Sequence, residues 1–126
     1  GITTDRTKAG LGDGDEDPDA LQGVPASPGV REGTARVIRD ASQLSEVVQD
    51  EILVCPITAP AWGAIFGKIQ AAVSDIGGIM SHAAIVSREY GLPAVVGTGN
   101  GTTKIKTGDR IRVDGDTGLV TILERA

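Results

Sequence analysis

The chain has 126 residues, of which 40% are apolar and 23% are charged, and it carries a formal net charge of −5. This length is typical of one domain with a core of its own, and the acidic balance argues against a nucleic-acid-binding protein, which normally has a basic stripe. No apolar run approaches the roughly 20 residues of a membrane helix, so neither a nucleic acid nor a membrane is an expected partner.

Cys55 is the only cysteine of the chain, and His82 is the only histidine. A single cysteine cannot form a disulfide within the chain, so a reducing compartment, the cytoplasm, is expected. One cysteine and one histidine also cannot build a zinc site of the usual kind, so no metal site is expected in this chain.

The first 22 residues are polar, glycine-rich and acidic, with almost nothing to bury. This composition is typical of a linker. We therefore expect residues 1–22 to be a flexible acidic linker and residues 23–126 to form the folded domain. The chain begins with Gly1, and no signal-peptide pattern follows it. We expect it to be an excised piece, one domain of a longer polypeptide.

Strands alternate with short helices along the rest of the chain. The apolar run 51–57 is typical of a buried strand, and Pro60 at a first helical position starts a helix that places Ile65, Phe66 and Ile69 on one face. In chain order the predicted elements are a strand over 33–40, a helix over 41–48, a strand over 51–57, a helix over 60–69, a strand over 71–75, a helix over 82–90, a strand over 93–97 and a hairpin over 104–123. This alternation predicts an α/β domain with a mixed central sheet and flanking helices.

Three other features receive structural interpretations. The glycine-rich stretch 97–101 does not have the G-x-G-x-x-G spacing of a dinucleotide-binding loop, and no clear helix follows it, so it is interpreted as a turn. Asp109, Asp114 and Asp116 fall in the turns of the predicted hairpin and are interpreted as turn formers. Cys55 lies within an apolar run and is interpreted as a small core residue.

His82 stands at the start of the predicted helix 82–90. Ser81 is a natural N-cap for this helix, and Gly91 followed by Pro93 ends it. The imidazole therefore lies at a helix N-terminus, where unpaired backbone N–H groups and the positive end of the helix dipole favour an anion.

The residues before this helix suit a phosphate ligand. Gly77 and Gly78 follow a buried strand and let the backbone approach a bulky group without a Cβ in the way. A neutral imidazole is a competent nucleophile toward phosphorus, so the arrangement suits a phosphohistidine. The alternative is that His82 is only the first residue of a helix that follows a turn. The local pattern leaves both interpretations open.

Two long stretches resemble a known family. "DIGGIMSHAAIVSREYGLPAVVGTG" (75–99) and "GDRIRVDGDTGLVTIL" (108–123) are similar to the mobile phosphohistidine (swivelling) domain of phosphoenolpyruvate (PEP)-utilising enzymes, and "SPGV" (27–30) and "TAPAW" (58–62) agree with that family as well. The family includes PEP synthase, pyruvate phosphate dikinase, Enzyme I of the sugar phosphotransferase system, rifampin phosphotransferase and phenylphosphate synthase. The resemblance implies a swivelling β/β/α domain over about residues 23–123.

The resemblance also implies roles for single residues. His82 matches the histidine that is phosphorylated in the family, and Gly77, Gly78 and Ser81 match the loop that presents it. Arg88 matches an arginine on the following helix that can help to neutralise the phosphate, although a solvated or ion-paired helix arginine is equally compatible with the pattern.

Two further positions have weaker assignments. Asp75 stands where the family often has Asp or Thr, and a simple turn acid at the end of a strand is the alternative. Thr58 lines the site or only leads into the helix that starts at Pro60.

One position departs from the family pattern. Dikinases and Enzyme I have Thr two residues before the histidine, where this chain has Met80. A hydroxyl that could support the imidazole is therefore expected to be absent. The departure favours the branches with an aliphatic residue at this position, such as proteins similar to rifampin phosphotransferase and phenylphosphate synthase.

The resemblance implies a phosphoryl-carrier domain of an ATP- or PEP-dependent phosphotransferase, which is not a complete catalyst alone. An ATP-grasp nucleotide-binding domain is expected to phosphorylate His82, and a second domain or subunit to hold the acceptor, such as pyruvate, an antibiotic or a phenol. This chain itself is expected to bind no cofactor, with Mg²⁺ and ATP or PEP held by the partner domains. The alternatives are a stand-alone phosphocarrier subunit and a non-catalytic domain of the same fold with an interaction or regulatory role.

Overall fold

The computed structural model describes residues 19–58 and 60–126, and residues 1–18 of the predicted linker 1–22 lie outside this part. The strands are β1 (Ala20–Gln22), β2 (Val24–Ser27), β3 (Val30–Val37), β4 (Ile52–Cys55), β5 (Ala71–Ser74), β6 (Ala94–Val96), β7 (Arg110–Asp114) and β8 (Leu119–Glu124). The helices are the 3-10 helices η2 (Ala41–Glu46) and η3 (Pro60–Gly67) and the α-helices α1 (His82–Tyr90) and α2 (Gly101–Lys104). The described strands form one mixed sheet in the order β1-β8-β7-β3-β4-β5-β6-β2.

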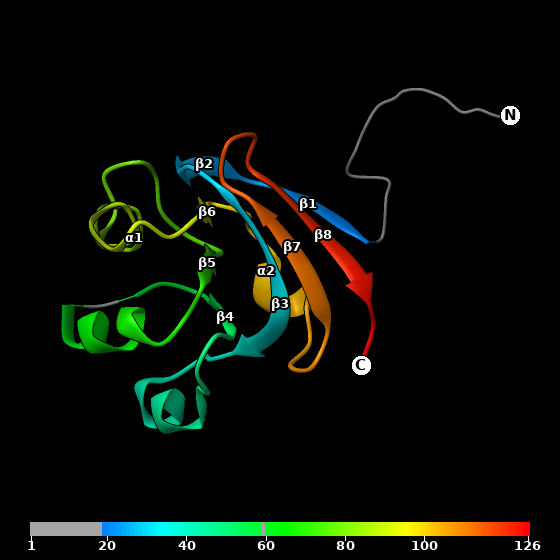
Figure 1. The fold of residues 1–126 in the computed structure, drawn as a ribbon, viewed down its shortest axis with the longest axis horizontal. Helices are drawn as coiled ribbons and strands as arrows, with labels where there is room; N and C mark the ends of the chain where they lie inside the picture. Colours follow the sequence, from blue (N-terminus) through cyan, green and yellow to red (C-terminus); the bar gives the residue numbers. More distant parts are fainter. Residues whose placement is uncertain (1–18, 59) are drawn as a thin grey trace, which may run out of the picture.

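The long strand β3 joins two halves of this sheet. Its first part, Val30–Thr34, pairs with β7 in antiparallel fashion, and its last part, Ala35–Val37, pairs with β4 in parallel fashion. The antiparallel half continues through β8 and β1, and the parallel half continues through β5 and β6 (Figure 1). Because β3 belongs to both halves, the sheet curls at this strand and the two halves face each other.

Side chains that alternate along the parallel strands fill two separate cores. On β4, Ile52 and Val54 pack between the two halves, together with Ile111 and Val113 of β7. Their neighbours Leu53 and Cys55 point to the opposite face of the sheet and pack against helices. Strands that are buried on both faces read as continuous apolar runs, which explains why the sequence 51–57 shows no alternation.

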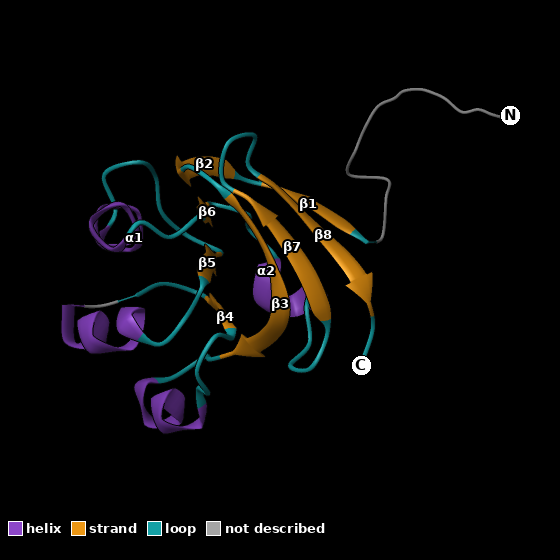
Figure 2. Cartoon of the chain, viewed as in Figure 1, coloured by secondary structure: helices purple, strands orange, loops and turns teal. Residues whose placement is uncertain are grey.

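The helices η2, η3 and α1 cover the outer face of the parallel half, so that the molecule has a β/β/α arrangement (Figure 2). Ile65, Phe66 and Ile69 are buried in this layer, as predicted. The predicted fold class, an α/β domain with a mixed central sheet and flanking helices, is thus confirmed. No helix within the described residues is long and apolar enough to cross a membrane.

Several predicted boundaries need correction. The strand predicted over 33–40 begins at Val30, and the helices predicted over 41–48 and 60–69 are 3-10 helices. The last three residues of the predicted linker form β1, because Leu21 buries its side chain in the core between the two halves.

The end of the chain contains two further differences from the predictions. A short helix, α2, follows the glycine-rich stretch 97–101, where no clear helix is apparent in the sequence. Asp109 is buried and accepts hydrogen bonds from the backbone N–H groups of Lys106 and Ala126. It therefore fixes the chain end as well as a turn, whereas Asp114 caps the hairpin turn through the N–H groups of Asp116 and Thr117, as predicted.

One ion pair links β3 to the start of β4. Arg36 donates to both carboxylate oxygens of Glu51, at 3.0 and 2.9 Å, and Glu51 also accepts the N–H of Val48. Burial alone raises the pKa of Glu51, but the hydrogen bonds from Arg36 and Val48, with the charges of Arg36 and Lys68, lower it below its ordinary value.

A carboxyl whose pKa is lowered by folding stabilises the folded state above its unfolded pKa, and this contribution disappears as the pH falls through the folded pKa. We therefore expect Glu51→Gln to lower the free energy of unfolding by about 1 kcal/mol at neutral pH and to have little effect in acid. Urea unfolding at several pH values measures this. Glu124→Gln, at an exposed carboxylate, is the control, and an equal loss for both variants would contradict the prediction.

Candidate functional site

The loops that follow the parallel strands β4, β5 and β6 meet at one edge of the sheet. Parallel neighbours place their carboxyl ends at the same edge, where ligand sites of open α/β sheets are usually found. The N–H of Ile76 donates to the carbonyl of Pro56 at 2.9 Å, and the N–H of Thr98 donates to that of Ser74 at 3.2 Å. Residues 56–58, 75–81 and 97–100 therefore form one loop cluster.

The second of these loops leads into α1. The Ser81 side chain caps α1 by accepting a hydrogen bond from the N–H of Ala84, and the Ser81 N–H donates to the carbonyl of Gly78 at 3.0 Å. His82 is the first residue of α1, and the helix ends at Gly91, which has the left-handed φ of 71°. The predicted helix 82–90 and both of its caps are confirmed.

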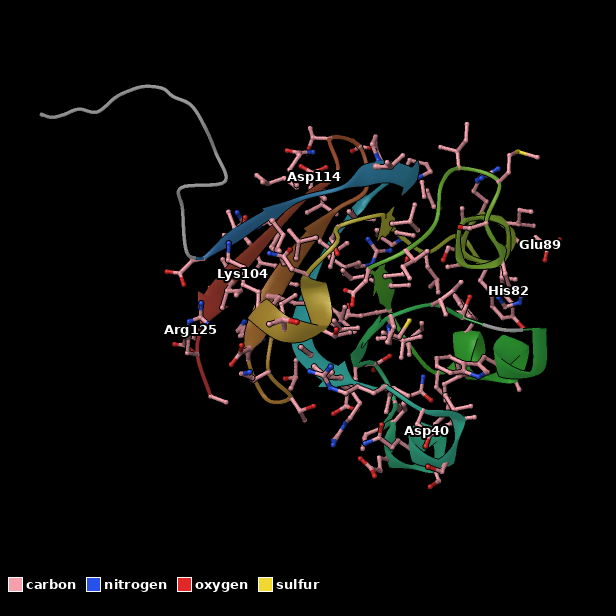
Figure 3. All side chains as sticks on the ribbon, turned by 180° about the vertical axis from the view of Figure 1, so that it is seen from behind. Asp40, His82, Glu89, Lys104, Asp114 and Arg125 are labelled. Atoms are coloured by element: carbon pink, nitrogen blue, oxygen red, sulfur yellow. The ribbon has the colours of Figure 1, made fainter. Side chains whose placement is uncertain are left out.

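Two contacts orient the His82 imidazole, which is half-buried between α1 and η3 (Figure 3). Its Nδ1 is 2.7 Å from the hydroxyl oxygen of Thr58. The ring of Phe66, in η3, meets it edge-on at a centroid distance of 6.0 Å. Since Nδ1 is engaged, Nε2 is the ring nitrogen that remains open to a reacting group, and it has no hydrogen-bond partner among the described residues.

Thr58 corrects the expectation derived from Met80. The sequence suggests that the imidazole has no supporting hydroxyl, because Met80 replaces the threonine of other family members. The hydroxyl comes instead from Thr58, which is 7% exposed and lies in the loop after β4. Met80 is 75% exposed and its side chain is directed to solvent. Adjacent parallel strands thus bring together two groups that are 24 positions apart in the sequence.

Arg88 lies in the last turn of α1, away from the imidazole. Its guanidinium donates to the backbone carbonyls of Ala26, at 3.0 Å, and of Ile79. It therefore ties α1 and the loop 75–81 to β2. Among the described residues Arg88 forms no ion pair and no hydrogen bond with His82, and its guanidinium is engaged by these two carbonyls.

Asp75 is also directed away from His82. Its carboxylate accepts the backbone N–H of Thr102 at 2.9 Å and the Thr102 hydroxyl at 2.6 Å. These bonds hold the start of α2 against the end of β5. Of the candidate residues, the structure thus groups Gly77, Gly78, Ser81 and Thr58 around His82, and it places Asp75 and Arg88 in supporting hydrogen bonds.

Two contacts of the site are not visible in the sequence. Phe66 belongs to the apolar face of η3, and nothing in the pattern distinguishes it from Ile65 or Ile69 as a neighbour of the imidazole. The bond from Arg88 to Ala26 spans 62 positions. Cys55 is buried near the site, but burial, with the charge of Asp75, raises the pKa of its thiol to about 12, so this thiol is not reactive near neutral pH.

Within residues 19–58 and 60–126, no group of three or more His, Cys, Asp or Glu side chains is arranged to hold a metal ion. Charged side chains are also rare around the imidazole. Between residues 52 and 103 only four residues carry charge. They are Lys68, Asp75, Arg88 and Glu89. Few charged side chains are therefore available in the segments that form the site.

A sequence model of the family described as "PEP-utilising enzyme, mobile domain" matches residues 47–118. An uncharacterised phosphotransferase of Bacillus subtilis, YvkC, is 44% identical over 82% of this chain, a probable phosphoenolpyruvate synthase of Staphylothermus marinus is 49% identical over 79%, and a rifampicin phosphotransferase of Streptomyces sviceus is 46% identical over 86%. The chain spans only 12 to 13% of the length of these relatives.

Two solved structures have a similar fold. A solution structure of an Enzyme I protein matches with a TM-score of 0.56 and 34% identity, covering 64% of this chain and 33% of its own length. A crystal structure of Thermococcus kodakaraensis aconitase X matches with a TM-score of 0.64 and 25% identity, covering 83% of this chain and 98% of its own. Proteins with different names thus share this fold, so the fold alone does not define the chemistry.

The two glycines before Ser81 differ in their structural need for glycine. Gly77 has a φ of +128°, and a Cβ there would lie 3.0 Å from the Ser81 Cβ, whereas Gly78 has open space around its Cβ position. We expect Gly77→Ala to lower the free energy of unfolding by about 1 to 3 kcal/mol and Gly78→Ala to leave it nearly unchanged. Chemical denaturation of the two variants measures this. Equal effects would contradict the assigned loop conformation.

Proposed function

The chain belongs to the family of mobile domains of PEP-utilising enzymes, and from this premise we propose that His82 carries a phosphoryl group between two active sites of a phosphotransferase. The relatives with the matching domain are named phosphotransferases and PEP synthase. In this proposal the domain is one part of an ATP- or PEP-dependent phosphotransferase and does not complete the reaction alone.

The observation that supports this proposal best is the hydrogen bond between His82 and Thr58. A neutral imidazole is a donor at one ring nitrogen and an acceptor at the other. If Nδ1–H donates to the Thr58 hydroxyl oxygen, 2.7 Å away, Nε2 keeps its lone pair and can act as a nucleophile. The edge of Phe66 limits rotation of the ring, so the nucleophilic nitrogen stays exposed in one orientation.

The transfer step follows from this arrangement. The Nε2 lone pair attacks the phosphorus of the donor, the P–O bond to the leaving group breaks, and the leaving oxygen keeps the bonding electron pair. No proton has to leave the ring, because Nε2 carries none in this tautomer. At the second site an oxygen of the acceptor attacks the same phosphorus, and Nε2 regains its lone pair when the N–P bond breaks.

The N-terminus of α1 supports the phosphorylated form. Within the described residues the N–H groups of His82 and Ala83 have no hydrogen-bond acceptor, as is usual in the first turn of a helix. Such N–H groups and the helix dipole stabilise an anion by a modest amount. The carrier thus holds the phosphoryl group without a cationic side chain next to it.

We propose that ATP or PEP, with Mg²⁺, binds to partner domains and not to this chain. The chain has no P-loop motif, and it spans about an eighth of the length of its relatives. A nucleotide-binding domain of the ATP-grasp type as the donor, and a separate domain or subunit that holds the acceptor, are the partners that the family resemblance implies. β1 and β8 lie on the side of the domain opposite to α1, the helix that carries His82 (Figure 1).

The proposed carrier role can be tested directly at His82. In the full natural protein, with its partner subunit if the donor domain is a separate chain, incubation with ATP or PEP is expected to add one phosphoryl group that is labile in acid and stable in base. We expect His82→Ala to abolish this adduct, as measured by intact-protein mass spectrometry. An adduct that survives the substitution would contradict His82 as the carrier. Absence of any adduct with an active partner would favour a non-catalytic interaction domain.

The role of the Thr58 hydroxyl can be tested by removing it. Thr58→Val keeps the shape of the side chain and removes the hydroxyl, and a hydrogen bond is worth about 1 kcal/mol. We therefore expect phosphorylation of His82 to slow by about three- to tenfold, with a change in the imidazole tautomer that NMR of the ring nitrogens detects. Thr58→Ser retains the hydroxyl and is expected to restore both. An unchanged rate and tautomer in Thr58→Val would show that the bond does not orient the nucleophile.

A further inference from the structure

Exposed apolar side chains are concentrated in the segments that carry Thr58 and His82. Eleven large apolar side chains are exposed in the described part of the chain, and five of them lie in the loops after β4 and β5 or on the first turns of α1. We call these five the apolar collar: Ile57, Ile76, Ile79, Met80 and Ile85. Contiguous exposed apolar surface of this kind usually marks a site of protein–protein contact.

Backbone hydrogen bonds fix the segments that carry the collar. The N–H of Ile76 donates to the carbonyl of Pro56, which precedes Ile57, and the N–H of Ile85 donates to the carbonyl of Ser81, which follows Met80. The Arg88 guanidinium donates to the carbonyl of Ile79. The collar is therefore a preformed surface, and docking on it costs little ordering of the loop.

The same face has almost no charge of its own. No charged residue occurs between 52 and 67 or between 76 and 87, the two stretches that contain the collar, Thr58 and His82. A phosphoryl group on Nε2 adds negative charge to this face. The nearest arginine along the chain, Arg88, is engaged by two backbone carbonyls. Cations that stabilise the phosphoryl group during transfer must therefore come from the partner.

We propose that the apolar collar is the docking surface for the phosphoryl-donor domain, which presents an apolar contact area around a cationic pocket. This inference rests on the proposed function of His82. Ile79 and Met80 precede His82 closely in the chain, and Ile57 is next to Thr58, which contacts the imidazole, so a domain that reaches Nε2 contacts the collar. The chain spans about an eighth of the length of its relatives, so most of a relative's chain lies outside the part compared here and can supply such a domain.

In this contact the collar supplies the apolar surface and the partner supplies the cations. Apolar contact excludes water from the transfer site, and in that low-dielectric setting the partner's cations interact more strongly with the transferred phosphoryl group. A carboxylate placed in the collar would lose its hydration on docking without a cation positioned for it.

The experiment compares two phosphoryl donors on the same variants. Ile79→Glu places a charge in the collar, and Val48→Glu places the same charge at a side chain of equal exposure outside it, since these side chains are 56% and 55% exposed. Ile79→Leu keeps an apolar group. Each variant of the full natural protein is phosphorylated by its donor domain with ATP or PEP, and separately by phosphoramidate, a small donor that needs no docking. In the second reaction Nε2 forms a bond to phosphorus, and the P–N bond of phosphoramidate breaks to release ammonia, which takes its proton from water.

We expect Ile79→Glu to slow phosphorylation by the donor domain at least about tenfold and to leave the phosphoramidate reaction within about twofold of the unsubstituted protein. Val48→Glu and Ile79→Leu are expected to react normally with both donors. Thermal unfolding verifies that the variants are folded. The docking surface would be wrong if Ile79→Glu reacted with the donor domain at an unchanged rate, or if it lost rate equally with both donors. It would also be wrong if Val48→Glu slowed the reaction with the donor domain as much as Ile79→Glu does.

Failure of the proposed function has a different outcome. If the unsubstituted protein forms an adduct with phosphoramidate but none at His82 with an active donor domain, the carrier role is wrong, whatever the collar variants do. If the unsubstituted protein is phosphorylated at His82 by its donor domain and Ile79→Glu is phosphorylated at the same rate, the carrier role stands and the docking surface is wrong.

Discussion

The parallel pairing of β4 with β5 is the constraint on which the site depends. The register aligns Ile52 with Ala71 and Cys55 with Ser74, so both strands end at the same edge of the sheet and their loops are neighbours. The first loop carries Thr58 and the second leads to Ser81 and His82. The 2.7 Å contact between the Thr58 hydroxyl and Nδ1 therefore follows from sheet register, and a shift of one residue would separate the two groups and turn buried side chains to the wrong face.

The charged residues near the site serve the architecture and leave the imidazole without a counter-ion. Arg88 binds two backbone carbonyls, and Asp75 binds the start of α2. Both residues thereby hold the loop cluster in place around His82. In the proposed carrier, backbone N–H groups at the start of α1 would stabilise a phosphoryl group by only a modest amount, which suits its release at a second site. Partner domains that supply cations only while docked would make both transfers depend on contact.

The helix that presents His82 could be predicted residue by residue because its signals are local. An N-cap serine, an alanine-rich turn and a glycine at the left-handed C-cap position all act within a few residues, and the observed helix has the predicted bounds. Predictions that depended on distant partners were less accurate. The sequence predicts a linker at β1 because this strand is ordered by distant partners: its backbone pairs with β8, and Leu21 packs in the core between the two halves. α2 was missed because it is only four residues long and its N-terminus is held by Asp75, 27 positions earlier in the chain.

The sequence by itself determined the layers of the fold, the position of the lone histidine at a helix N-terminus, and the family to which the chain is similar. These features follow from patterns that repeat every two to four residues or from a contiguous motif. Only the tertiary structure decided which hydroxyl supports the imidazole, which groups Arg88 and Asp75 bind, and which apolar side chains of the loops after β4 and β5 stay exposed. Such relations arise from strand order and loop proximity, and residues 20 to 60 positions apart become neighbours only when the sheet has formed.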